Sequence, residues 1–154
     1  RALDDGAGEI NMVINIGAVK SRDFSFVEDD IAAVLGVCKG RVVTKVILET
    51  CLLEREEKIK VCEIARRLRA DFVKTSTGFS HMGATVEDVR LMKSCCGDLM
   101  QVKAAGGISN LSSLMSMLEA GATRIGTSSS ISIIGEARKK GLEKSRDEMT
   151  DKSV

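Results

Sequence analysis

The chain has 154 residues, of which 44% are hydrophobic, and its 23 basic and 22 acidic side chains leave a formal net charge of +1. This length is typical of one domain, so we expect a single domain over residues 1–154 with a polar C-terminal tail from about residue 139. The balanced charge argues against nucleic acid as a partner, because phosphate binding requires a basic excess. An apolar run of the roughly 20 residues that span a bilayer is lacking, which argues against a membrane protein.

The cysteine and histidine content argues against a metal site and for a reducing compartment. The chain has one histidine and five cysteines, which form no CxxC pair: Cys38, Cys51, Cys62, Cys95 and Cys96. Zinc sites need several closely spaced Cys or His ligands. Because scattered thiols in odd number are typical of the cytosol, we expect a cytoplasmic protein with free, buried cysteines. For the adjacent Cys95 and Cys96, packing near a helix end is the simplest interpretation, and redox activity is the alternative.

Short apolar segments alternate with longer amphipathic segments along the whole chain. The short segments are almost continuously apolar, as strands buried on both faces of a parallel sheet are. We predict five strands, at residues 9–16, 42–49, 71–77, 99–105 and 124–127. Two stripes with helical spacing lie between them and are predicted to face the core: Val61, Ile64, Ala65 and Leu68, then Leu111, Leu114, Met115 and Leu118.

Helix-end signals support these boundaries. The charged run at residues 54–58 is interpreted as the solvated start of a helix. Thr85, followed three residues later by Asp88, resembles a capping box at the start of the next helix. Gly121 stands where a left-handed residue would end a helix.

Five strand–helix units predict a parallel sheet, for which the pattern leaves two arrangements. One is a complete five-stranded doubly wound domain of flavodoxin type, for which about 150 residues is a natural size. The other is part of a (β/α)₈ TIM barrel, which usually needs about 250 residues. Length favours the doubly wound domain, whereas the chemistry of the strands favours the barrel.

Three lysines lie inside apolar strands at intervals of 29 residues: Lys45, Lys74 and Lys103. Because the interval is one strand–helix repeat, we expect the three ammonium groups to be neighbours. A doubly wound sheet would point them into its helix layers, where an unpaired charge costs several kcal/mol, whereas a barrel would point them at its axis. Crowded ammonium groups lower one another's pKa, and a neutral lysine can form a Schiff base with a carbonyl. The spacing does not indicate which of the three reacts.

Turns rich in glycine and hydroxyl groups follow three of the predicted strands, at residues 74–79, 103–108 and 126–129. Glycine lets backbone N–H groups approach an anion, and hydroxyl groups add donors. The last two turns stand where barrels commonly bind phosphate, next to a short helix that residues 128–135 could supply. Each turn alone would suit an ordinary strand–helix connection, but together with the lysines they predict a site for a phosphorylated carbonyl compound.

Five motifs in order resemble the 2-deoxyribose-5-phosphate aldolase family over about residues 8–135: EINMVIN from 9, KVILET from 45, KTSTGF from 74, KAAGG from 103 and RIGTSS from 124. The resemblance implies a (β/α)₈ TIM barrel, of which this chain would hold the last five βα units, starting at the fourth strand. It implies a class I aldolase without metal or organic cofactor, which reversibly cleaves 2-deoxy-D-ribose 5-phosphate to D-glyceraldehyde 3-phosphate and acetaldehyde. Family members are commonly dimeric, so a homodimer is a candidate quaternary state.

The resemblance also implies roles for individual residues. Lys74 matches the lysine that forms the Schiff base, and Lys103 matches the lysine that perturbs it and assists proton transfer. Lys45 matches a lysine that lines the same interior. The other implied substrate contacts are Thr77, Gly78, Gly106, Gly107, Gly126, Ser128 and Ser129.

One catalytic position departs from the family pattern. The family has an acidic residue that relays protons where this chain has Asn11, whose amide can hold a water molecule but cannot accept its proton. Some family substrate contacts also belong to the three strands that would precede this chain. The alternatives to an active aldolase are therefore a non-catalytic fragment or member of the family and, more remotely, an unrelated doubly wound phosphate-binding module.

Overall fold

The computed structural model describes the backbone of residues 1–151 and the side chains of residues 1–141. Its strands are β1 (Glu9–Val13), β2 (Val43–Ile47), β3 (Phe72–Lys74), β4 (Gln101–Ala105) and β5 (Arg124–Gly126). All neighbouring pairs are parallel, and the order across the sheet is β1-β2-β3-β4-β5. The predicted number and sequence of strands is confirmed, and each observed strand lies within its predicted range.

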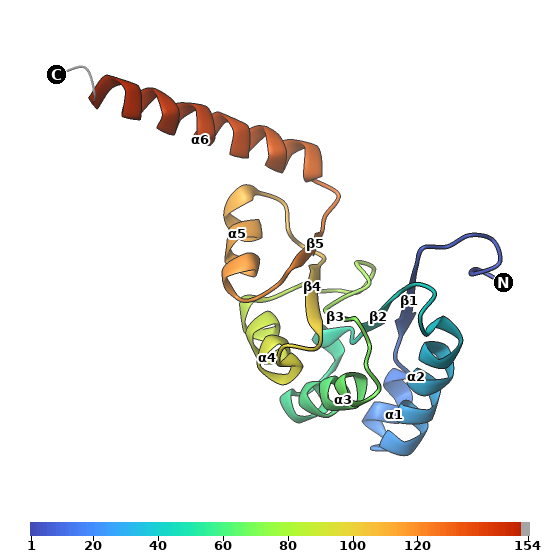
Figure 1. Ribbon diagram of the computed structural model, residues 1–154. Coiled ribbons are helices and arrows are strands. Elements are labelled where there is room, and N and C mark those ends of the chain that lie inside the picture. The colour runs from blue at the N-terminus through green and yellow to red at the C-terminus, as the bar shows by residue number, and fades with distance from the viewer. Residues whose placement is uncertain (152–154) are drawn as a thin grey trace.

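The strand order separates the two arrangements that the sequence left open. A doubly wound sheet reverses its strand order at a switch point, whereas a barrel pairs each strand with the next one along the chain. The described strands follow the barrel order. Figure 1 shows the helices in an arc around one side of the sheet, which leaves the other side for the barrel interior. These helices are α1 (Ile16–Lys20), α2 (Phe24–Cys38), α3 (Arg55–Arg67), α4 (Val86–Cys96) and α5 (Leu111–Glu119).

An ion pair between the first and last strands shows how strongly the sheet curves. Arg124 Nη1 on β5 lies 2.6 Å from Glu9 Oε1 on β1. In a flat sheet these strands would lie four inter-strand spacings apart, or about 19 Å. The contact therefore requires the sheet to bend around its helix-free face, which we call the concave face. This curved, sequentially ordered sheet is the partial (β/α)₈ barrel that was expected.

The apolar core lies between the convex face of the sheet and the helices. Side chains that alternate with the concave-face residues are buried there, including Val46, Val73 and Val102. The predicted stripe of α3 packs against them, with Val61, Ile64 and Ala65 buried and Leu68 partly buried: this prediction is confirmed. On the opposite face Ile47, Phe72 and Ala105 are buried as well, which explains why the strands are almost continuously apolar.

The predicted stripe of α5 is wrong in part. Leu111 and Leu114 pack against the core, but Met115 is 44% exposed and Leu118 is 40% exposed, while Met117 is buried instead. The reason is that α5 covers β5, the outermost strand of the described sheet. Helix α6 (Ser130–Asp151) contacts α5 but then runs away from the rest of the chain, so it covers only part of that helix.

The predicted helix ends are confirmed, but at Thr85 only the N-cap hydrogen bond of the expected capping box is present. Thr85 is the N-cap of α4, and its side chain accepts a hydrogen bond from the N–H of Asp88 at 3.0 Å. Gly121 follows α5 with φ of +108°. The tail expected from about residue 139 continues α6 to Asp151, and residues 152–154 lie outside the described part.

The charged run at residues 54–58 opens α3 as predicted, with Glu54 as N-cap, but it is not simply solvated. Glu57 pairs with Lys20 at 2.7 Å. Lys58 reaches Asp88 on α4, also at 2.7 Å, and both partners of this second pair are largely buried. These two ion pairs join α3 to α1 and to α4.

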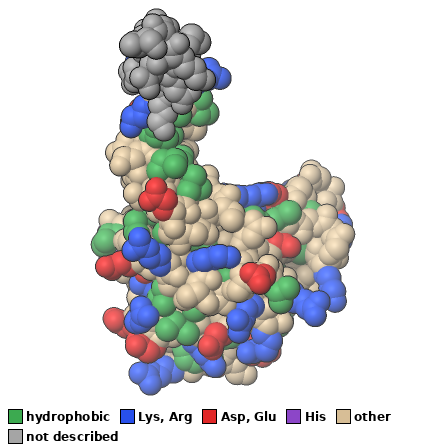
Figure 2. Space-filling view, turned by 60° about the vertical axis from the view of Figure 1, so that its left-hand side comes forward, with side chains coloured by type: hydrophobic (Ala, Val, Ile, Leu, Met, Phe, Trp, Pro, Cys, Tyr) green, Lys and Arg blue, Asp and Glu red, His purple; other side chains and the backbone are tan. Residues whose placement is uncertain are grey.

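The surface and the thiols agree in part with the expectations from composition. In the face shown in Figure 2, basic and acidic side chains are interspersed. Within the described residues, none of the helices has both the length and the apolarity to cross a membrane. All five cysteines are free, but Cys51 and Cys95 are only partly buried. Among the described residues, no cluster of three or more His, Cys, Asp or Glu side chains could hold a metal ion.

Candidate active site

A pocket of about 600 Å³ opens at the carboxyl ends of β3, β4 and β5. Its wall consists of the two strand lysines and the loops that follow the strands. The lining residues are Lys74, Thr77, Gly78, Lys103, Ala105, Gly106, Gly107, Ile108, Ser109, Gly126, Thr127, Ser128 and Ser129. Every site residue expected from the sequence is among them except Lys45 and Asn11. In barrels this end of the strands is where active sites lie.

Lys74 and Lys103 meet in this pocket because the register of the sheet pairs them directly. Paired residues on parallel strands point to the same face, so both ammonium groups lie on the concave face. Burial is the largest cause that lowers the pKa of Lys74, and the charges of Lys103 and Lys45 lower it further. The pKa of Lys103 is also lowered, mainly by burial and then by the charge of Lys45. Both changes favour the neutral amine that nucleophilic attack requires.

Lys45 does not stand level with the other two lysines. In the register between β2 and β3, Ile47 pairs with Lys74, while Lys45 pairs with Phe72. Although the sequence intervals are equal, Lys45 is shifted by two residues relative to Lys74 in the register of the sheet. A shift of two residues keeps Lys45 on the same face but places it deeper, toward the amino ends of the strands. Its side chain is only 1% exposed there. Lys45 therefore does not hold the position on β2 equivalent to those of Lys74 and Lys103, although its charge still lowers the pKa of both.

Glu9, for which no sequence motif predicted a role, supplies the counter-charge in this deeper layer. Its carboxylate lies 2.5 Å from Lys45 Nζ and 2.6 Å from Arg124 Nη1. The guanidinium of Arg124 also lies over the ring of Phe72, 4.7 Å from its centroid. The hydrogen bonds to Lys45 and Arg124 lower the pKa of Glu9 to about 2. Glu9 is therefore ionised at neutral pH and acts as a fixed anion rather than as a base.

Asn11 lies on β1, where the register pairs it with Lys45. It is exposed, and it lies on the same face of the strand as Glu9, which precedes it by two residues. The structure therefore places Asn11 on the concave face and in the deeper layer, but not in the wall of the pocket.

Two glycines allow the pocket loops to pack closely. A Cβ atom on Gly83 would lie 2.2 Å from the carbonyl oxygen of Gly106, to which Ala84 donates a hydrogen bond at 3.0 Å. A Cβ atom on Gly126 would lie 3.4 Å from Lys103 Cε and 2.9 Å from the Cβ atom of Ala105. Gly83 was not among the expected site residues, because its partner lies in a loop that is distant in the sequence.

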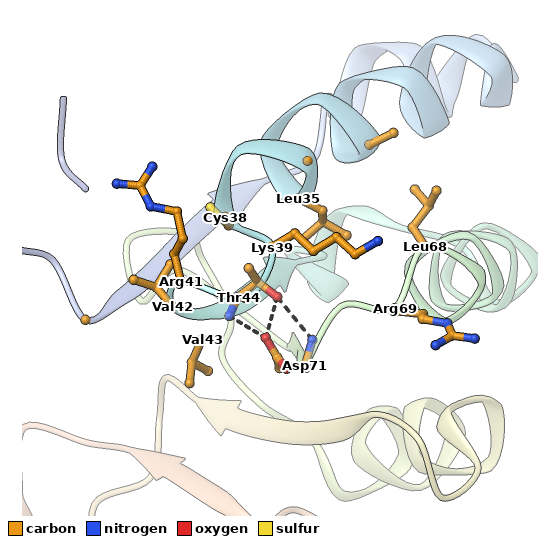
Figure 3. A pocket seen from close by; sticks show the side chains of 14 residues that line it. Leu35, Cys38, Lys39, Arg41, Val42, Val43, Thr44, Leu68, Arg69 and Asp71 are labelled. Carbon is orange, nitrogen blue, oxygen red and sulfur yellow. Dashed lines mark hydrogen bonds between the residues drawn. The ribbon is translucent and has the colours of Figure 1, made fainter. Parts of the chain in front are cut away.

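A second cavity, of about 590 Å³, lies at the opposite ends of the strands, where β2 and β3 begin. Figure 3 shows Thr44 and Asp71 linked beside it, with Lys39, Arg41 and Arg69 around them. The N–H and Oγ1 of Thr44 donate to Asp71 Oδ2 at 2.8 and 2.7 Å, and the N–H of Asp71 donates to Thr44 Oγ1 at 3.1 Å. These bonds fix the starts of β2 and β3 relative to each other, so we assign Thr44 and Asp71 a role in stability.

Comparisons with curated proteins point to one family. A family model described as DeoC/LacD family aldolase matches residues 1–137. The deoxyribose-phosphate aldolase of Thermococcus kodakarensis is 58% identical over 135 residues, which are 87% of this chain and 60% of that protein. Deoxyribose-phosphate aldolase 1 of Oceanobacillus iheyensis is 54% identical over 134 residues, which are 87% of this chain and 61% of that protein. The chain thus spans about three-fifths of the length of these relatives.

Solved structures share the same fold. An aldolase named QR15 is 47% identical with a TM-score of 0.84, and the match covers 92% of this chain and 63% of that one. A deoxyribose phosphate aldolase from Aeropyrum pernix, described as tetrameric, is 31% identical with a TM-score of 0.77, covering 88% of this chain and 57% of that one. With the strand order and the lysine pair at the carboxyl ends of the strands, these matches show that the chain belongs to the DeoC/LacD family of aldolases.

Proposed function

We propose that this chain reversibly cleaves 2-deoxy-D-ribose 5-phosphate to D-glyceraldehyde 3-phosphate and acetaldehyde through a Schiff base on Lys74. The observation that carries the proposal is the pair of Lys74 and Lys103, both with lowered pKa, in a pocket whose remaining wall is rich in glycine and hydroxyl groups. The names of the relatives at 54–58% identity support the same activity.

In this mechanism the neutral amine of Lys74 adds to the aldehyde carbon of the open-chain sugar, and loss of water gives the imine. The protonated imine accepts the electron pair of the C2–C3 bond as that bond breaks, while the C3 hydroxyl loses its proton and becomes the aldehyde of glyceraldehyde 3-phosphate. Protonation of the remaining enamine and hydrolysis then release acetaldehyde and the free lysine. The ammonium group of Lys103 lies beside Lys74 and favours the neutral form of that amine.

The phosphate group would bind at the other end of the pocket. Gly106 and Gly107 have φ of +88° and +74°, a conformation that glycine adopts without strain and that exposes backbone N–H groups. Ser128 and Ser129 stand directly before Ser130, where α6 begins. The N–H groups and the dipole at a helix N-terminus favour an anion.

The test is to trap the imine on the purified chain. Sodium borohydride with acetaldehyde should leave a reduced two-carbon adduct, which mass spectrometry of peptides should find on the peptide that contains Lys74. Release of acetaldehyde from 2-deoxyribose 5-phosphate should be measured on the same sample. An adduct on Lys103 instead would refute the assignment of the nucleophile.

The second candidate is a non-catalytic member of the family, which Asn11 favours because an amide cannot relay a proton. A folded chain, shown by circular dichroism, that binds the sugar phosphate but forms neither adduct nor acetaldehyde would establish this alternative and exclude the aldolase.

Replacing Gly126 by Ala should lower turnover about fivefold, because the added methyl group presses on Ala105 and on the Lys103 side chain. The free energy of unfolding should fall by no more than about 1–3 kcal/mol. Steady-state kinetics and urea unfolding would measure both quantities. The matched control is Gly36→Ala in α2, where the new atom meets nothing within 4 Å and turnover should not change.

A further inference from the structure

Glu49 occupies an unusual position at the end of β2, next to the pocket but outside its lining. Its side chain is 4% exposed, and its backbone has φ of +54° and ψ of +62°. Residues with side chains rarely adopt this left-handed conformation, and burial of a carboxylate is unfavourable unless hydrogen bonds compensate. Strain of this kind concentrates at functional sites, where surrounding contacts hold it in place.

The carboxylate of Glu49 accepts hydrogen bonds from one residue of the pocket wall, Thr77. The Thr77 hydroxyl donates to Glu49 Oε2 at 2.5 Å, and the Thr77 N–H donates to the same oxygen at 3.1 Å and to Oε1 at 3.4 Å. The Thr77 hydroxyl oxygen in turn accepts the N–H of Phe79 at 3.1 Å. Glu49 thereby holds the start of the loop that carries Gly78 into the pocket.

The backbone on both sides of Glu49 is fixed to the chain that leads from β3 into this loop. The N–H of Leu48 donates to the carbonyl of Lys74, and the N–H of Thr50 donates to the carbonyl of Thr75, both at 2.9 Å. The strained residue therefore lies between two fixed points, and its side chain ties down the next part of the same loop. The charge of Glu49 also raises the pKa of Lys74, against the larger lowering effect of burial.

We propose that Glu49 is a positioning residue that, through Thr77, fixes the pocket wall between Lys74 and Gly78 and so sets the affinity for the phosphorylated substrate. The proposal rests on the aldolase function proposed above. It separates two contributions of one side chain: the hydrogen bonds, which a glutamine can largely keep, and the negative charge, which a glutamine lacks.

Two variants of Glu49 distinguish these contributions. Glu49→Ala should raise KM for 2-deoxyribose 5-phosphate about tenfold, because Thr77 loses its charged acceptor, with a smaller effect on kcat. Glu49→Gln should keep KM within about twofold, since its amide oxygen still accepts from Thr77. The acid limb of its pH–rate profile should move to lower pH, because Lys74 loses the nearby anion that raises its pKa. The control is Glu56→Gln, an exposed glutamate of α3, which should change neither quantity.

A double-mutant cycle tests whether Glu49 acts through Thr77. Thr77→Val removes the hydroxyl donor, and the double variant with Glu49→Ala should bind substrate no more weakly than Glu49→Ala alone. The proposal would be overturned if the increases in KM of the two single variants add in the double variant. It would also be overturned if the acid limb of the pH–rate profile is unchanged in Glu49→Gln. If Glu49→Ala does not fold, comparison of Glu49→Gln with Thr77→Val decides the same question through the pH profile and KM.

Binding of inorganic phosphate separates this proposal from the aldolase function. Calorimetry needs no turnover, and Glu49→Ala should bind phosphate about tenfold more weakly than the unaltered chain. Equal phosphate affinity in two folded samples would refute the positioning role even if cleavage is observed. Conversely, weaker phosphate binding in Glu49→Ala without any cleavage by the unaltered chain would refute the aldolase function and leave the positioning role intact.

Discussion

Replacement of Lys74 by Met should abolish trapping of acetaldehyde and lower turnover of the sugar phosphate by at least about 10³-fold, as loss of a covalent nucleophile does. Met has nearly the length of Lys but no amine, so the wall of the pocket should keep its shape.

The pH dependence of the free energy of unfolding should also change in this variant. Because burial lowers the pKa of Lys74, the unfolded chain binds more protons than the folded one between the lowered value and about 10.5, so stability rises with pH across that window. This rise should be smaller in the Met variant.

Lys103→Met is the matched control, since it makes the same change on the neighbouring strand at a paired position. Its borohydride adduct should still form on the peptide that contains Lys74. Peptide mass spectrometry, steady-state kinetics and urea unfolding at several pH values are the measurements. An adduct that persists in Lys74→Met would show that the nucleophile lies elsewhere.

Replacement of Asn11 by Asp should raise turnover between about 10-fold and 10³-fold, because a positioned general acid or base commonly contributes about 10²–10⁴-fold. The structure explains why the nearby carboxylate of Glu9 does not supply this function already. Glu9 lies on the same face of β1, but its carboxylate is bound by Lys45 and Arg124, which hold its pKa near 2. A carboxylate at position 11 would stand beside Lys45 in the register and could accept a proton from water.

Steady-state kinetics on 2-deoxyribose 5-phosphate should show the gain in kcat, with KM within about twofold of the unaltered chain because Asn11 does not line the pocket. Asn11→Ala serves as the control, since it alters the same position without adding a carboxylate and should give no gain. If kcat in Asn11→Asp is unchanged while Lys74 still forms its adduct, another group relays the proton.

The fold and the pocket wall could be predicted largely from local patterns. Near-continuous apolar segments indicate parallel strands, and the carboxyl ends of such strands lie at one edge of the sheet. The loops that contain Gly78, Gly107 and Ser128 therefore had to converge. Recognition of the family motifs then separated Lys74 from the other two strand lysines.

The remaining features depend on contacts that no local pattern encodes. The depth of Lys45 follows from the register between β2 and β3, which an interval counted along the sequence does not determine. Glu9 meets Arg124 only because the sheet curves, and Glu49 contacts Thr77 from a left-handed backbone conformation that its sequence does not indicate. Likewise, which side of α5 is exposed depends on the elements that pack against the helix. The spacing of apolar residues within the helix does not determine those neighbours.

The contact between Glu9 and Arg124 also makes the edges of the sheet interdependent. In repeat arrays where each unit touches only its neighbours, the ends can fray independently. Here an ion pair joins Glu9 and Arg124, which are separated by 115 positions. Release of β1 would leave Arg124 and Lys45 without their anion, and release of β5 would leave Glu9 with Lys45 alone. The sheet should consequently open as one cooperative unit rather than from one end. A contact of such long sequence separation also forms late, which slows folding relative to a strictly local array of strand–helix units.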